Sequence, residues 1–177
     1  MALATALATI LVTTQVMADT AFVDGFEDMP AMPGMTVCCP GDPYETEEIT
    51  KASVDLDGPL YLRIGKSGEP TVHGGSPPPI QIGRGAVLHR GEKIAIAATG
   101  NMLPTAVAAR ELLAVKGVDA TLVSMHTVKP FDADLVAELA RDHEIVATVE
   151  EHVAHGGLGA ATARVIAEQG GPARLRL

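Results

Sequence analysis

Tryptophan is absent from this 177-residue sequence, and aromatic residues make up only 3% of it. A core without large rings has to be built from the Ala, Val, Leu, Ile and Met side chains that supply most of the 47% apolar residues. Such a composition is typical of α/β packing, in which helices lie close on a sheet. The length suits one ordinary domain, or one domain and part of a second.

Cysteine is scarce too, since the sequence has only Cys38 and Cys39. Adjacent cysteines lack the spacing of metal ligands, and an ordinary disulfide between them is disfavoured. We interpret both as small buried residues of a protein in a reducing compartment, and we expect the cytoplasm.

Positive charge is missing from residues 1–50, which contain eight acidic side chains and no Lys or Arg. The rest of the chain has 13 basic and 14 acidic residues and no basic stripe. A nucleic-acid-binding protein needs clustered cations to neutralise phosphates, so this class is excluded. A small anionic substrate needs only a few local cations and is compatible with the sequence.

No apolar run reaches the ~20 residues that a membrane crossing needs, because Thr and Gln interrupt the opening run. That run and Ala18 resemble the core and cleavage site of a signal peptide. The first Lys is Lys51, however, so the positively charged start of a signal peptide is missing. We therefore expect neither a membrane protein nor a secreted one.

Gly, Ser and Pro crowd residues 65–79, a composition that forms a connector and cannot hold a helix or a central strand. Before this connector, apolar runs at residues 35–40 and 58–64 predict two strands. Between them, Asp42 is in position to cap a helix that Pro43 begins. The chain thus divides into two blocks, one on each side of the connector.

The second block repeats the rhythm of strand and helix more clearly. A helix is predicted from Asp132, because Leu135, Val136, Leu139 and Ala140 form one apolar stripe. The other expected elements are two strands within 86–99 that meet at 90–92, a helix at 103–116, strands at 118–125 and 144–149, a helix at 157–169 and a last strand at 173–177. This alternation predicts an α/β fold with a mostly parallel, mixed sheet flanked by helices.

The stretch from Glu150 to Glu168 puts two acids, two histidines and a glycine cluster in front of a helix. Gly156, Gly157 and Gly159 either let backbone N–H groups approach an anion or allow a tight turn from strand to helix. The spacing matches neither a dinucleotide fingerprint nor a P-loop. We therefore favour the turn.

Two further ligand sites were weighed against simpler interpretations. Glu151, His152 and His155 could bind zinc, but they lie on a loop without a remote partner, so we expect His152 to donate a hydrogen bond at an interface instead. Lys129 follows a strand, where open α/β sheets bind ligands, and could meet an anion. A Lys before Pro is more often a solvated loop residue, and we favour that interpretation.

Five segments are informative when they are taken together. They are P-G-M-T-V-C-C-P-G-D-P-Y-E-T (33–46), G-P-L-Y-L-R-I-G-K (58–66), A-T-G-N-M-L-P-T-A-V-A-A-R-E-L-L (98–113), S-M-H-T-V-K-P-F-D (124–132) and E-E-H-V-A-H-G-G-L-G-A-A (150–161). In order and spacing they resemble the C-terminal portion of the transketolase family of thiamine-diphosphate enzymes. The family includes deoxyxylulose-phosphate synthases and the beta subunits of 2-oxoacid dehydrogenases.

The resemblance implies a domain organisation. Residues 1–72 would be part of a pyrimidine-binding domain, with residues 1–20 unplaced, residues 73–79 a linker, and residues 80–177 a transketolase C-terminal domain without its last helix. Two departures concern the first block. Val23 stands where the family usually has a His, four residues before Glu27-Asp28, and residues 27–33 are shorter than the family pattern.

The resemblance also implies a cofactor and partners. In this family thiamine diphosphate and Mg²⁺ lie between the pyrimidine domain of one subunit and the pyrophosphate domain of its partner. This chain contains neither a pyrophosphate domain nor the family's catalytic glutamate. We therefore expect it to work only in a homo- or hetero-oligomer with a chain that supplies the pyrophosphate-binding domain, and to be inactive alone.

The implied activity is the transfer of a two-carbon ketol group between sugar phosphates through the thiamine carbanion. Lys66 occupies the position of an Arg that grips the substrate phosphate, and Arg63 precedes it, so both are predicted phosphate ligands. A Lys keeps the charge of that Arg and loses its bidentate fork. The simpler alternative is that Lys66 is only a linker charge.

No catalytic residue is expected in the second block, where the resemblance implies packing between subunits and makes the stretch after Glu150 a structural turn near a subunit contact. Two other functions stay open. The chain could be a beta-type subunit of a 2-oxoacid dehydrogenase, or a non-catalytic module for oligomerisation or docking.

Overall fold

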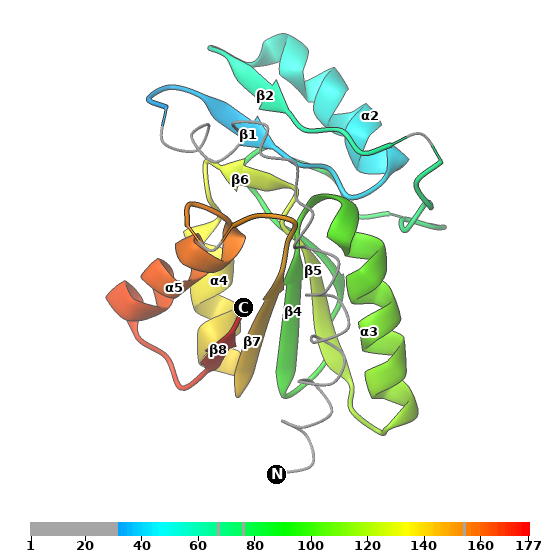
Figure 1. Ribbon diagram of the computed structural model, residues 1–177, viewed down its shortest axis with the longest axis vertical. Coiled ribbons are helices and arrows are strands. Elements are labelled where there is room, and N and C mark those ends of the chain that lie inside the picture. Colours follow the sequence, from blue (N-terminus) through cyan, green and yellow to red (C-terminus); the bar gives the residue numbers. More distant parts are fainter. Residues whose placement is uncertain (1–31, 67, 76, 154) are drawn as a thin grey trace.

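The computed structural model describes residues 32–66, 68–75, 77–153 and 155–177. In this part of the chain a three-stranded sheet lies across the carboxyl ends of a five-stranded sheet (Figure 1). The expectations for the opening apolar run, for Val23 and for Glu27-Asp28 concern residues outside the described part.

The three-stranded sheet has the order β2-β1-β6. Strand β1 (Thr36–Cys38) pairs in parallel with β2 (Leu60–Leu62), and helix α2 (Pro43–Ala52) and a short 3-10 helix (Ser53–Asp55) connect them. The predicted strand-helix-strand unit is therefore confirmed. The third strand, β6 (Thr127–Lys129), comes from the second block and runs antiparallel to β1. The two blocks thus share a sheet.

The five-stranded sheet has the order β3-β5-β4-β7-β8. Its strands are β3 (Ala86–His89), β4 (Ile94–Ala98), β5 (Ala120–Ser124), β7 (Ile145–Val149) and β8 (Arg174–Arg176). All neighbouring pairs are parallel except β3 with β5, so the predicted mostly parallel sheet is confirmed.

The sheet order separates two strands that are consecutive in the sequence. The two strands within residues 86–99 are present, but they do not meet as neighbours, because β5 lies between β3 and β4. The short connection crosses the end of β5, where Gly91 N–H donates to Thr121 Oγ1 at 2.9 Å and Glu92 N–H donates to the Asp119 carbonyl at 3.1 Å. These long-range hydrogen bonds fix the connection between β3 and β4.

Helices cover both faces of the larger sheet (Figure 1). Helix α3 (Leu103–Val115) lies on one face, and α4 (Ala133–Asp142) and α5 (Leu158–Gln169) lie on the other. Strand β4 is apolar throughout because Ile94, Ile96 and Ala98 join the core on the α3 side while Ala95 and Ala97 join the core on the α4 and α5 side. Among the described helices, none combines the length and apolar character needed to cross a bilayer.

The predicted helix starts are confirmed at two aspartates. Asp42 Oδ1 accepts a hydrogen bond from Glu45 N–H at 2.9 Å, and Pro43 begins α2. Asp132 Oδ1 accepts one from Leu135 N–H at 3.2 Å at the start of α4, whose predicted apolar stripe is buried. In both cases the side chain satisfies an N–H group that has no partner within the helix.

The connector at residues 65–79 contains neither helix nor strand where the structure describes it, as its composition predicts. It is nevertheless held against the fold, since His73 is only 8% exposed. The domain boundaries drawn around the connector stay a prediction.

Two adjacent leucines on α3 test how the core contributes to stability. Leu113 is fully buried, whereas Leu112 is 53% exposed. We expect Leu113→Ala to lower the free energy of unfolding by about 2–5 kcal/mol, because it removes buried apolar contacts and leaves a cavity. Leu112→Ala should change it by less than about 0.5 kcal/mol. Urea unfolding measures both, and equal losses would contradict this packing.

Candidate functional site

The order of strands reverses between β4 and β7, because the chain passes from β4 to β5 on one side and later to β7 on the other. Open α/β sheets bind ligands at the carboxyl ends of strands at such a point. The cavity found there has a volume of ≈ 20 Å³, room for only one or two water molecules. Its lining residues are Cys39, Arg63, Thr99, Gly100, Asn101, Val128, Glu150, Glu151, His152 and Gly157.

The carboxylate of Glu150 occupies the start of α5. Its carboxylate accepts hydrogen bonds from Leu158 N–H and Gly159 N–H, both at 2.7 Å. A side chain at Gly157 would collide with this carboxylate. The glycine cluster therefore forms the predicted turn, and the anion at this helix N-terminus is the protein's own Glu150.

His152 in this loop and Lys129 in β6 each contact a backbone carbonyl of the chain itself. His152 Nδ1 lies 2.8 Å from the carbonyl oxygen of Val153. Among the residues that the structure describes, no group of three His, Cys, Asp or Glu side chains could hold a metal ion. The interpretation of Lys129 as a solvated loop residue is wrong, because Lys129 ends β6 and its Nζ donates to the Met32 carbonyl, so this Lys holds the chain before β1.

The two predicted phosphate ligands lie in different places. Arg63 lines the small cavity, where its Nη1 donates to the Glu151 carbonyl at 3.1 Å and its Nη2 lies 3.9 Å from Glu151 Oε2. Lys66 is exposed and lines a separate groove of ≈ 450 Å³ between the start of α2 and the connector. Asn101 borders both spaces.

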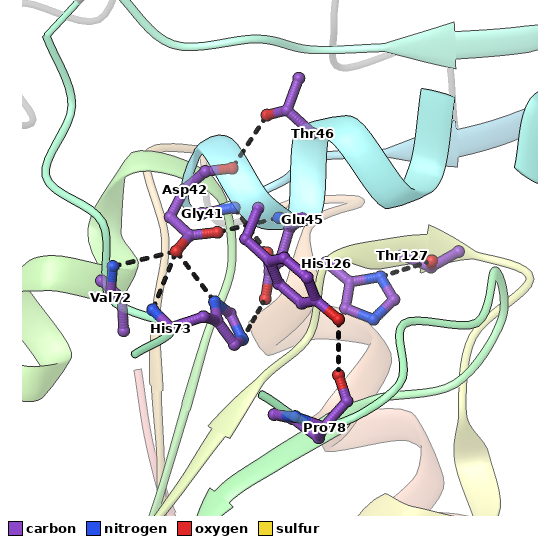
Figure 2. Close-up of polar contacts among 10 residues, drawn as sticks. Gly41, Asp42, Glu45, Thr46, Val72, His73, Pro78, His126 and Thr127 are labelled. Carbon is purple, nitrogen blue, oxygen red and sulfur yellow. Dashed lines mark hydrogen bonds and ion pairs between the residues drawn. The ribbon is translucent and has the colours of Figure 1, made fainter. Parts of the chain in front are cut away.

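A buried polar cluster, which sequence reasoning missed, joins the connector to α2 (Figure 2). His73 Nδ1 lies 2.9 Å from Asp42 Oδ2, and His73 Nε2 lies 3.5 Å from Glu45 Oε1. The rings of His73 and Tyr44 have centroids 5.2 Å apart. The only signal in the sequence was a single His within a segment of Gly, Ser and Pro.

Burial sets the charge of this cluster. It raises the pKa of Glu45, against opposing hydrogen bonds from Ser124 and Gly41. Burial would also raise the pKa of Asp42, but hydrogen bonds from Glu45 N–H and from His73 outweigh it, so this pKa is lowered. The pKa values of the two carboxyl groups therefore move in opposite directions, so Asp42 ionises more readily than Glu45.

Burial also shifts the pKa values of two cysteines and a histidine away from neutral pH. It raises the pKa of Cys38 to about 11 and that of Cys39 to about 12, so neither free thiol is a nucleophile at neutral pH. His126 is fully buried, and its Nδ1 lies 3.0 Å from Thr127 Oγ1. Burial, with a smaller contribution from nearby His73, lowers the pKa of His126 to about 4.

The starts of three helices do not fit the diphosphate of thiamine diphosphate. A diphosphate needs N–H donors or cations, whereas the starts of α2, α4 and α5 are each occupied by a carboxylate of this chain. The same part of the chain offers no cluster of ligands for Mg²⁺.

Comparison with known proteins identifies the family of this chain. A model of the transketolase C-terminal domain matches residues 83–176. The chain belongs to this family. A 1-deoxy-D-xylulose-5-phosphate synthase of Dechloromonas aromatica is 37% identical over 140 residues, which cover 78% of this chain and 22% of the synthase. A putative transketolase C-terminal section of Methanocaldococcus jannaschii is 36% identical over 143 residues, or 80% of this chain and 44% of that protein.

A solved structure has the same fold as this transketolase-family chain. It is described as a split gene transketolase, an inactive beta4 tetramer, and it superposes with a TM-score of 0.81 at 36% identity. The match covers 90% of this chain and 52% of that one. The chain thus spans between a fifth and about half of the length of these relatives.

The carboxylate of Glu150 offers a test of the turn. Glu150→Gln keeps one acceptor oxygen for two N–H donors and loses the charge, so we expect a loss of about 1–3 kcal/mol in the free energy of unfolding. Glu151→Gln is the matched control, because its carboxylate contacts Arg63 near the surface, where ion pairs contribute about 0–1 kcal/mol. Chemical unfolding measures both, and a larger loss for Glu151→Gln would refute the role of Glu150.

His126 predicts a dependence of stability on pH. Its pKa is about 4 in the folded chain and ordinarily 6.5. The unfolded chain therefore takes up the proton first as the pH falls from 6.5 towards 4, and about 3 kcal/mol of stability is lost in that window. His126→Asn, which keeps a polar partner for Thr127, should remove most of this loss, whereas the same change at exposed His155 is the control. The free energy of unfolding of each variant, measured between pH 4 and 7, tests this. The same pH dependence in both variants would contradict the prediction.

Proposed function

We propose that this chain is the C-terminal part or small subunit of a transketolase-like enzyme that transfers a two-carbon ketol group between sugar phosphates. The observation that supports this most strongly is the likeness to the split gene transketolase over 90% of the chain. That relative is inactive as a beta4 tetramer, which favours an enzyme whose activity needs a second kind of chain.

The partner in this proposal supplies the pyrophosphate-binding domain, in a homo- or hetero-oligomer, and the assembly binds thiamine diphosphate with Mg²⁺. The carboxylates that occupy the starts of α2, α4 and α5 favour this assignment. The cofactor would supply the group-transfer chemistry, and this chain would orient the substrate. Residues 1–72 would form part of a pyrimidine-binding domain, and residues 80–177 would pack against other subunits. The proposed compartment is the cytoplasm.

Lys66 is the proposed ligand of the substrate phosphate. It is exposed on the groove of ≈ 450 Å³, which is large enough for a small ligand, whereas the cavity beside Arg63 is not. Arg63 would contribute from the adjacent cavity, where the Glu151 carbonyl orients its guanidinium. A Lys binds phosphate as a point charge without a fixed geometry, so several sugar phosphates would be accepted.

A second candidate is the reaction of the curated relatives. The synthase of Dechloromonas aromatica is named for a product that carries a 5-phosphate, and its identity to this chain is 37%. The same Lys66 would serve that reaction, so product analysis has to distinguish the two.

Substitution of Lys66 tests the proposed function. In an assembly reconstituted with a pyrophosphate-domain chain, Lys66→Ala should raise the KM for a pentose 5-phosphate by about tenfold or more, because a charge-assisted hydrogen bond is lost. Lys66→Arg should leave the KM of the unsubstituted assembly unchanged or lower it, since Arg adds a bidentate contact.

Lys51→Ala is the matched control for this experiment. Lys51 lines the same groove, but it is paired with Glu47 and Glu48 at 2.7 and 2.8 Å. Its KM should stay within about twofold of the original. An unchanged KM for Lys66→Ala would overturn the phosphate role.

A further inference from the structure

The segment that carries Lys66 has no secondary structure of its own to hold it. We call the connector together with Ile64 the strap (residues 64–79), and its described residues form neither helix nor strand. The position of the strap therefore depends on contacts with the rest of the protein, which include packing of Val72 against the core. The Tyr44 hydroxyl donates to the Pro78 carbonyl at 3.3 Å near the end of the strap, and the backbone N–H groups of Val72 and His73 donate to Asp42.

The two oxygens of Asp42 have separate roles. Oδ1 accepts from Glu45 N–H at 2.9 Å and caps α2. Oδ2 accepts from the backbone N–H groups of Val72 and His73, both at 2.9 Å, and lies at the same distance from His73 Nδ1 (Figure 2). One oxygen thus holds the helix, and the other holds the strap.

This contact is buried, which makes it strong. Asp42 is 3% exposed, and the side chains of Glu45 and His73 are sealed from solvent. Hydrogen bonds to an ionised acceptor in such surroundings are stronger than those between neutral groups. The other ionisable or polar groups around the cluster are Tyr44, Ser124 and His126.

Asp42 and Lys66 line the same groove. The start of α2 forms one wall, and strap residues 64–66, 68 and 69 form the other. The width of the groove at Lys66 is therefore set by the place where the strap is fixed to α2, only a few residues farther along the chain.

We infer that Asp42 is a positioning residue for Lys66: through Val72 and His73 it holds the strap against α2, and so places the Lys66 ammonium where a substrate phosphate binds. This inference rests on the proposed function of Lys66. It assigns no chemical step to Asp42, which touches neither substrate nor cofactor.

The variant Asp42→Asn separates the two oxygens. Asn is as good an N-cap as Asp, so its oxygen keeps the bond to Glu45 N–H and α2 stays intact. Its NH₂ group, however, faces the N–H groups of Val72 and His73 and cannot accept from them. We expect the amide hydrogens of these two residues to exchange at least about tenfold faster, with no change at Ile49 in α2.

The same variant should act on substrate through Lys66. In the reconstituted assembly, Asp42→Asn should raise the KM for a pentose 5-phosphate several-fold with little change in kcat. Combined with Lys66→Ala, it should add nothing to the rise in KM that Lys66→Ala causes alone, because both act on one contact.

Asp132→Asn is the matched control. Asp132 also caps a helix with Oδ1, and its Oδ2 accepts from Gly85 N–H at 2.9 Å, beyond the strap. It should leave the exchange at Val72 and His73 and the KM unchanged. If Asp42→Asn does not fold, His73→Phe removes the ring contacts alone and should speed exchange at the same two amides.

The outcomes separate the inference from the proposed function. Unchanged exchange at Val72 and His73 would overturn the hold of Asp42 on the strap. Faster exchange with an unchanged KM, where Lys66→Ala does raise the KM, would overturn the positioning role and leave the proposed function standing. No effect of Lys66→Ala would overturn the proposed function and the positioning role together.

Discussion

The structure depends on how buried backbone N–H groups find acceptors where strands give way to helices. Three carboxylates solve this problem, and each uses both oxygens. Asp42 joins α2 to the connector, Asp132 joins α4 to the chain before β3, and Glu150 takes two N–H groups of α5. Because an unpaired buried N–H group is costly, these contacts fix the loops as well as the helices.

The same carboxylates limit what the chain can bind. Helix N-termini and the carboxyl ends of parallel strands are the usual places for phosphates, and here carboxylates of the chain itself occupy the starts of α2, α4 and α5. The cavity at the strand ends has room only for water molecules, whereas the groove beside Lys66 has room for an anionic ligand. On the proposed function, such a chain would orient a substrate and leave the cofactor to a partner.

Much of the fold could be predicted from local sequence. Asp42-Pro43 marks a helix start, Leu135 to Ala140 mark a buried helix face, and both are confirmed. Strand β6, the separation of β3 from β4 and the buried His73 were missed, because each depends on partners 26 or more positions away, such as Val37 with Lys129. Local propensity carries no information about such pairings.

The central claim is that the cofactor site needs a second chain. Calorimetric titration of thiamine diphosphate with Mg²⁺ into the purified chain, alone and then with a pyrophosphate-domain chain, tests it most directly. The account predicts no binding tighter than about millimolar to the chain alone and clear binding after the partner is added. Binding to the chain alone, or none even with the partner, would contradict it.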